Sequence, residues 1–327
     1  MRRRDALLAL SVILFSGAVV AATAEAQLRL RIGHQGSLEN PSGLGSKRMA
    51  ETADRLSNGK LKIDIFPNAQ LGPDLDMLSQ VRVGTLDMAM IGSGVVGSIE
   101  PTFNLTELPF IWKSDTSAWQ VLNGSVGQRI LGLLEAKGIK GLGWGVWGFR
   151  GFLLTNKAIT TPDDFKGVKI RVIESALYIS TLKSFGANPV PMAWPEVYTG
   201  LQQKTIDGVE TNYHGMADAK HYEVAKQLAV TDHIYTATVF VMNLNKFRSL
   251  PPDLQKVVVD AARAGGERMR ETANKANHDA IELMTRHGVK VTRPDRQAFE
   301  AKIKPVYKQF AVMVGQDLID EALAAQK

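Results

Sequence analysis

The chain has 327 residues, enough for two domains of ordinary size, and its composition is that of a globular protein. It contains no cysteine, which excludes disulfides, thiol catalysis and thiolate metal sites. The formal net charge is +6, but the basic residues are dispersed and no nucleic-acid-binding signature accompanies them. The charge therefore indicates a mild bias toward anionic ligands and no nucleic-acid partner.

The first 26 residues predict a cleaved signal peptide. Three arginines, Arg2 to Arg4, precede an apolar run over residues 6–22, and Ala24-Glu25-Ala26 fits the small-x-small rule for cleavage before Gln27. A membrane anchor is the alternative, because the run is about the shortest that spans a bilayer. The cleavage site and the lack of a second apolar span favour secretion. The arginines also fit a loose twin-arginine pattern, which leaves the export route open.

Up to residue 137, β-prone runs alternate with amphipathic stretches, which predicts an α/β fold. The expected strands are 28–34, 61–66 and 86–91, and the expected helices are 41–57, one that begins at Pro73-Asp74, and 114–137. The glycine- and serine-rich segment 92–97 lacks the Lys-Ser/Thr ending of a phosphate-binding loop. We expect a tight connection there that borders a cleft.

Residues 141–154, GLGWGVWGFRGFLL, have an unusual composition. Five glycines weaken any strand, yet the aromatic side chains favour burial. A strand that crosses between two domains beside a ligand meets both demands, so we place the first crossover there. The strongly β-prone run 235–243 is the candidate for a second crossover.

The segment 164–212 reads as strand, helix, strand, helix, strand. The expected elements are strand 168–173, helix 175–185, extended 187–192, a helix that begins at Pro195, and strand 209–212. Successive βα units of this length predict a parallel sheet, whose ligands sit beyond the carboxyl ends of the strands. Arg171 and Asn212 both fall at such ends.

From Pro251 to Met284 a helical period persists for 34 residues, or ~51 Å at 1.5 Å per residue. That is longer than one small domain is wide, so this helix is expected to span both domains, with Gly265-Gly266 as the place for a bend. The remaining expected elements are helix 216–223, strands 227–230 and 289–292, and helix over 295–326.

Nothing in the sequence predicts catalysis. The six histidines include no pair at metal-ligand spacing, there is no GxSxG elbow, and no carboxylates form a recognisable acid–base pair. We expect neither an enzyme nor a metal or other cofactor.

Arg171 is the sharpest binding candidate, because a guanidinium offers a planar fork that matches the two oxygens of a carboxylate. The alternative is a surface arginine in a salt bridge on a half-exposed strand. Asn212 can donate and accept hydrogen bonds at once, or it can be a turn residue. Glu210 points to the same face if the segment is extended, and would orient an arginine or bind a ligand hydroxyl.

Trp194 is held extended by Pro195, so it can stack on a ligand or pack in the core. Further candidates for the ligand-binding site are Trp147, Phe149, His34, Glu39, Ser93, Tyr213 and His214.

Several motifs occur in the order typical of one family. They are KGVKIRV, FGANPVPM, PEVYTGLQQKTIDGVE, HYEVAKQLAVTDH and VMNLNKFRSLPPDLQKVV, with PNAQLGPDLDMLSQVRVGTLDM earlier. The chain after its first ~26 residues resembles the periplasmic solute-binding proteins of TRAP transporters. It departs from the pattern at Gly200, where Ala is more usual, at Lys204, where Gly is common, and at Tyr213-His214, where Pro is frequent.

The resemblance implies a bilobed, periplasmic-binding-protein-like α/β fold. Two α/β domains would be joined by crossover strands and a long domain-spanning helix. The expected bounds are residues 27–148 plus 237–276 for lobe I, and residues 149–236 plus 277–327 for lobe II.

The resemblance also implies the function. The protein would be a periplasmic, monomeric binding subunit that captures a small organic acid between its lobes and delivers it to a TRAP permease. Arg171 would hold the carboxylate, Arg150 would be a second ligand arginine or a hinge ion pair, and Asn212 would contact the ligand. The acid stays open among C4-dicarboxylates, sugar acids, 2-oxo acids and aromatic acids; Trp194 and Tyr213-His214 favour a hydroxylated or ring-bearing monocarboxylate. The alternatives are a periplasmic sensor partner and a soluble enzyme on a similar fold.

Overall fold

Two mixed β-sheets form the centre of the molecule and share one long strand, β4 (Ile139–Leu154), which pairs antiparallel in both. The computed structural model describes residues 27–326, so the predicted signal peptide lies outside the described residues. In the first sheet the strand order is β2-β1-β3-β9-β4. Its strands are β1 (Leu28–Gly33), β2 (Leu61–Phe66), β3 (Met88–Gly92) and β9 (Tyr235–Asn243).

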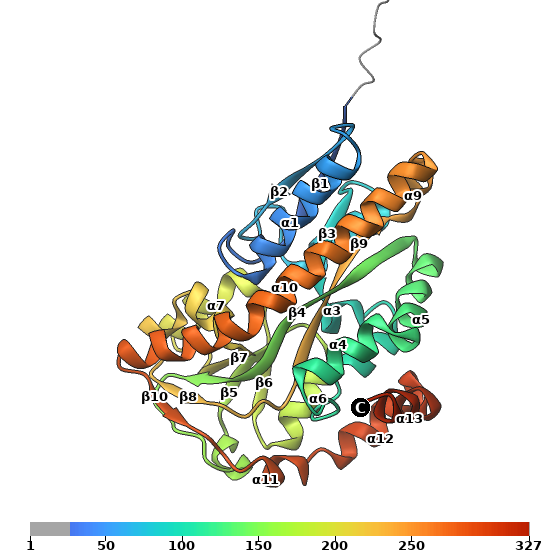
Figure 1. Ribbon diagram of the computed structural model, residues 1–327. Helices are drawn as coiled ribbons and strands as arrows, with labels where there is room; N and C mark the ends of the chain where they lie inside the picture. The colour runs from blue at the N-terminus through green and yellow to red at the C-terminus, as the bar shows by residue number, and fades with distance from the viewer. Residues whose placement is uncertain (1–26, 327) are drawn as a thin grey trace, which may run out of the picture.

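The second sheet continues from β4 in the order β7-β5-β6, with β8 and β10 beside it. Its strands are β5 (Lys169–Val172), β6 (Asn188–Pro191), β7 (Gly208–Asn212), β8 (Gln227–Ala229) and β10 (Lys290–Thr292). The pairs β5–β6 and β5–β7 are parallel, as the βα units predict. We call the halves of the molecule around the two sheets the first lobe and the second lobe (Figure 1).

The strand β4 passes from one lobe to the other, which confirms the predicted crossover. It pairs with β9 from Ile139 to Phe149, and with β7 from Arg150 to Leu154. The register shifts twice along the first part, and Gly148 has a φ of 90° that a side chain would disfavour. The strand β9 pairs with β4 along its whole length and with β3 over residues 238–242, and so returns the chain to the first sheet. The exact bounds of the lobes remain a prediction.

Helices cover both sheets, and several expected helices are shorter than the sequence indicated. The α-helices are α1 (Pro41–Leu56), α2 (Asp74–Val83), α3 (Ser93–Val96), α4 (Asp115–Asn123), α5 (Ser125–Leu133), α6 (Ala176–Ser184), α7 (Val197–Gln202), α8 (Tyr213–Asp218), α9 (Leu244–Ser249), α10 (Pro252–Arg286), α11 (Arg296–Glu300), α12 (Lys304–Val314) and α13 (Gln316–Ala324). The 3-10 turns are η1 (Pro101–Glu107), η2 (Leu134–Lys137), η3 (Pro162–Phe165), η4 (Trp194–Glu196) and η5 (His221–Glu223).

Glycines account for most of the differences between the expected and the observed helices. The single helix expected over 114–137 is divided between α4, α5 and η2, because Gly124 is extended between α4 and α5. The single helix expected over 295–326 is divided into α11, α12 and α13, with Gly315 at a φ of 91° between the last two. The connection expected at residues 92–97 holds the short helix α3, and the helix expected at 216–223 begins earlier, at Tyr213, and is followed by η5.

The helix α10 has 35 residues and lies along both lobes, as expected from its length. It packs against α1 in the first lobe and against α8 in the second, and it runs diagonally across the view in Figure 1. The two glycines in its middle allow a close approach to other backbone. A Cβ on Gly266 would lie 1.8 Å from the carbonyl oxygen of Trp144 in β4, and one on Gly265 would lie 2.8 Å from that of Gly45 in α1.

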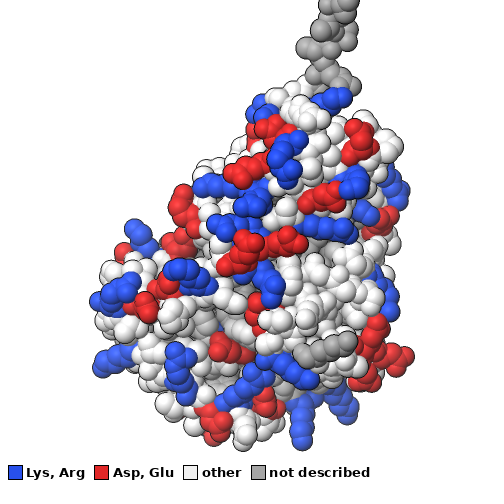
Figure 2. Space-filling view, viewed as in Figure 1, with Lys and Arg blue, Asp and Glu red and all other residues white. Residues whose placement is uncertain are grey.

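Within residues 27–326 no helix is both long enough and apolar enough to cross a membrane. On the face drawn in Figure 2, Lys and Arg are interspersed with Asp and Glu, in agreement with the dispersed charge of the sequence. Buried side chains form a cluster that contains both Trp144 of the first lobe and Phe165 of the second, so the core is continuous through the connection.

We expect Gly266→Ala to destabilise the protein by several kcal/mol, because backbone atoms of β4 cannot move away from the added methyl group. Gly132→Ala in α5 is the matched control, since a Cβ there meets nothing within 4 Å. The control should be neutral or stabilising by up to ~1 kcal/mol. Chemical denaturation of both variants measures the difference. Equal stability of the two would contradict the close packing of α10 on β4.

Candidate functional site

A cavity lies between the lobes, at the carboxyl ends of the parallel strands. Gln35 follows β1, Gly92 ends β3, Ile173 follows β5 and Asn212 ends β7, and all four line the cavity. The parallel strands predict a ligand site at this edge. The helices α1, α2 and α8 also begin here.

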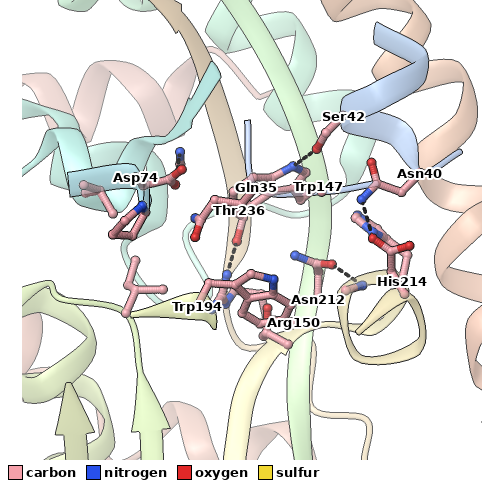
Figure 3. Close-up of a pocket in the computed structure, with 18 of the residues that line it drawn as sticks. Gln35, Asn40, Ser42, Asp74, Trp147, Arg150, Trp194, Asn212, His214 and Thr236 are labelled. Atoms are coloured by element: carbon pink, nitrogen blue, oxygen red, sulfur yellow. Dashed lines mark hydrogen bonds between the residues drawn. The ribbon is translucent and has the colours of Figure 1, made fainter. Parts of the chain in front are cut away.

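The structure brings six of the nine principal candidates into the lining of this cavity. They are Arg150, Arg171, Asn212, Trp147, Trp194 and His214. Glu210, His34 and Ser93 are buried outside the lining. Figure 3 shows Asp74 and His214 on opposite sides of the pocket, with Arg150 and Trp194 between them.

The buried guanidinium of Arg150 is fully paired. It sits on β4 just past the crossover and is held by both carboxylate oxygens of Glu210, with Nη2–Oε2 at 2.8 Å. Its Nη1 donates to Oγ1 of Thr236 on β9 at 2.9 Å. Burial opposes the charge of Glu210, but Arg150 overcomes it and lowers the pKa of Glu210 to about 2. Glu210 therefore orients an arginine, one of its two expected roles.

Arg171, in contrast, is buried without an anionic partner. It is 3% exposed, its Nε donates to the carbonyl of Met192 at 3.0 Å, and its guanidinium lies 5.4 Å from the ring centre of Trp194. Among the described residues, neither Nη1 nor Nη2 has a hydrogen-bond partner, and Nη1 is fully enclosed. Burial and the nearby Arg150 lower the pKa of Arg171 to about 10, so it is still a cation at neutral pH. The alternative of a surface salt bridge is wrong.

Two buried guanidiniums thus lie near each other, and Glu210 is hydrogen-bonded to that of Arg150, so the guanidinium of Arg171 has no carboxylate bonded to it among the described residues. An unpaired charge in a buried site is costly, and an anion that brings two oxygens removes the cost. The arrangement is therefore suited to one carboxylate.

Asp74 at the start of α2 was not expected in the site. Its Oδ2 accepts from the backbone N–H of Gly92 at 3.0 Å, while its Oδ1 is buried with no partner among the described residues. Burial raises the pKa of Asp74 to about 7. The sequence showed only an acid in the first turn of a helix, where acids are common. The sequence does not show that Asp74 lies directly beside the end of β3, and this position is what brings it into the site.

Other polar residues of the lining were also missed. They are Gln35, Asn40, Ser42, Glu174, Thr211, Asp218 and Thr236. Most lie in loops or on helix ends, where polar residues normally cap helices or face solvent, so no sequence signal separates them. Asn40, for example, caps α1 by accepting from the N–H of Gly43 at 3.1 Å.

Three of the expected site residues are held in place by hydrogen bonds to neighbouring elements. Trp147 donates from Nε1 to Oγ of Ser42 at 2.8 Å. Asn212 caps α8 through Oδ1, which accepts from the N–H of Gly215 at 2.8 Å, and this leaves its Nδ2 unbonded among the described residues. The backbone N–H of His214 donates to Asn277 of α10, and burial lowers the pKa of His214 to about 4.

The remaining candidates lie elsewhere. Ser93 donates to the buried Glu107 and to the carbonyl of Ala237, and Tyr213 donates to Asp232. Burial lowers the pKa of His34 to about 4 behind the cavity wall. Phe149 packs edge-on against Tyr235, and Glu39 is exposed near Lys47.

The comparisons with known proteins agree with this geometry. The family model described as bacterial extracellular solute-binding protein, family 7, matches residues 32–312. The 2,3-diketo-L-gulonate-binding periplasmic protein YiaO of Escherichia coli K12 is 36% identical over 271 residues, which are 83% of each chain.

Solved structures are similar over nearly the whole chain. The sugar acid binding protein DctPAm of Advenella mimigardefordensis, in complex with galactonate, has a TM-score of 0.89 at 30% identity, and the match covers 92% of this chain and 98% of that chain. A TRAP periplasmic solute-binding protein of Chromohalobacter salexigens with bound D-glucuronate has a TM-score of 0.87 at 29% identity, over 91% of this chain and 100% of that chain.

The fold and the cavity define a bilobed solute-binding protein. The chain belongs to family 7 of the bacterial extracellular solute-binding proteins, the periplasmic binding subunits of TRAP transporters. Proteins of this family bind small acid ligands and work with membrane subunits, which confirms the resemblance found in the motifs.

The raised pKa of Asp74 predicts a pH-dependent cost of folding. A buried acid with a pKa of about 7 destabilises the fold when ionised, so stability is full below the unfolded value near 4 and falls as pH rises toward 7. Asp74→Asn should therefore match the parent at pH 4 and exceed it by roughly 2–4 kcal/mol at pH 8.

Denaturant unfolding at both pH values measures this difference. Asp76→Asn, an exposed acid in the same turn, should show no such dependence. If the stability of Asp74→Asn relative to the parent did not rise between pH 4 and pH 8, Asp74 would be an ordinary ionised carboxylate.

Proposed function

We propose that this chain is an exported, periplasmic TRAP binding subunit for sugar acids, that is, polyhydroxylated monocarboxylates. It binds one carboxylate at Arg171 between its lobes, works as a monomer, performs no catalysis and delivers its ligand to a membrane permease. The observation that carries the proposal is the buried guanidinium of Arg171, whose Nη1 and Nη2 have no partner among the described residues.

The charges of the cavity support a single acid group. Its cations are Arg150 and Arg171, and Glu210 already neutralises Arg150. Its acidic residues are Asp74, Glu174 and Asp218. A second carboxylate on the ligand would meet these acids and no free cation, which costs several kcal/mol in a desolvated site.

The other polar groups of the cavity suit hydroxyls. Asp74 offers the free acceptor Oδ1, Asn212 offers the free donor Nδ2, and Gln35 offers an enclosed amide oxygen without a partner among the described residues. Sugar hydroxyls both donate and accept, so they can satisfy all three. Trp194 and Trp147 provide flat apolar walls for the carbon skeleton. The proteins of known structure that carry galactonate and D-glucuronate support this choice of ligand class.

A thermal-shift panel tests the proposal. We expect D-galactonate, D-glucuronate or a related sugar acid to raise the melting temperature by several degrees at millimolar concentration, because binding stabilises the folded state by mass action. Succinate and malate should give no shift, and neither should the uncharged sugar D-galactose. A dicarboxylate that stabilises more than every sugar acid would refute the assigned ligand class.

The role of Arg171 is tested by substitution. Truncating one partner of a desolvated ion pair costs ~2–5 kcal/mol, so Arg171→Ala should weaken binding roughly thirty-fold to several thousand-fold. Arg171→Lys keeps the charge but loses the planar fork, and should also bind poorly. Arg129→Lys, in an exposed pair with Glu321, is the control and should bind like the parent. Calorimetric titration with the sugar acid from the panel measures all three, and parent-like binding by Arg171→Lys would rule out a bidentate contact at Arg171.

A further inference from the structure

A hydrogen-bonded bridge closes the mouth of the cavity, and it is separate from the arginines. The carboxylate of Asp218, the last residue of α8 in the second lobe, accepts three hydrogen bonds from the loop after β1 in the first lobe. Ser37 donates from its N–H at 3.1 Å and from Oγ at 2.7 Å, and Asn40 donates from Nδ2 at 2.8 Å. The bonded residues are about 180 positions apart in the chain.

This bridge is the loop's hydrogen-bonded connection to the second lobe. Among the described residues, every hydrogen bond from residues 34–40 to the second lobe ends on Asp218, and the others stay within the first lobe. Asp218 lines the cavity and also two outer grooves, one beside Leu283 and one beside Tyr198. The carboxylate therefore stands in the wall between the cavity and the solvent.

The helix α8 links this bridge to the proposed ligand site. Asn212 caps the first turn of α8 and faces the cavity, and Asp218 ends the same helix six residues later. So short a helix moves as one piece. A ligand that seats Asn212 also places Asp218 against the loop, and opening of the lobes would break the three bonds. Asn40 would keep its cap on α1, because that bond uses Oδ1 and not Nδ2.

We propose that Asp218 is an interlobe clamp that sets the lifetime of the closed, ligand-bound form without touching the acid group. This inference rests on the proposed function, and it adds a residue that governs release. A clamp that forms only after the lobes meet acts on dissociation more than on association. Because Asp218 is exposed, the expected effect is smaller than that of Arg171.

The test uses Asp218→Asn, which keeps the shape but replaces an acceptor oxygen by an NH2 group facing donors. Stopped-flow kinetics with D-glucuronate as the probe should show dissociation accelerated roughly 5- to 50-fold, with association changed less than about threefold. Asp260→Asn, a partly exposed aspartate of α10 paired with Lys256, should leave both rates unchanged.

A double-mutant cycle separates the clamp from a general charge effect. Ser37→Ala removes one of the three bonds, so it should accelerate dissociation alone but add little to Asp218→Asn. Fully additive effects, or an unchanged dissociation rate in Asp218→Asn, would overturn the clamp.

A measurement of the distance between the lobes tests the clamp even if D-glucuronate does not bind. Because the chain lacks cysteine, spin labels can be placed at Glu51→Cys in α1 and Gln202→Cys in α7, one on each lobe. Asp218→Asn should shift the distance distribution of the unliganded chain to longer values. No binding by any panel acid would refute the proposed function, whereas an unshifted distribution would refute the clamp.

Discussion

The buried ion pair of Arg150 and Glu210 lies where β4 leaves the first sheet, and the site depends on it. Each partner alone would be an uncompensated buried charge, and removing one partner of such a pair typically lowers the stability of the fold by ~3–5 kcal/mol. Arg150 comes from β4, Glu210 from β7, and the Thr236 that completes the pair from β9. The pair therefore ties the three strands that connect the lobes. It also settles which of the two arginines stays free, because Glu210 cannot serve both.

The remaining features of the cavity are consequences of the same topology. Parallel strands of both sheets point their carboxyl ends at one gap, and α1, α2 and α8 begin there. The loops thus bring donors and acceptors from both lobes around one small volume, with Arg171 on one side and Asp74 on another. A site shared in this way favours the closed arrangement only when a ligand satisfies groups of both lobes.

The sequence predicted the fold well where a pattern extends over many residues. The period of α10, the alternation of β1 and the glycine-rich composition of β4 each indicated the right element, because burial on one face dictates the pattern. Breaks at Gly124 and Gly315 were missed, since one glycine inside a helical pattern is tolerated as often as it ends a helix. Arg171 and Asn212 were found because they stand at strand ends. Asp74 and Asp218 were not, because an acid on a helix end is ordinary until the neighbouring lobe is placed beside it.

The position of β9 has a consequence for how the chain acquires its structure. In the first sheet β9 lies between β3 and β4, although it follows them by some 80 residues or more. As the polypeptide emerges amino terminus first, β3 keeps an unpaired edge until residue 243 has appeared, about three quarters of the way through the chain. Open strand edges and incomplete cores invite aggregation. The early part of the chain must therefore be kept from associating with other chains throughout synthesis, and its first lobe becomes complete only after most of the second has been made.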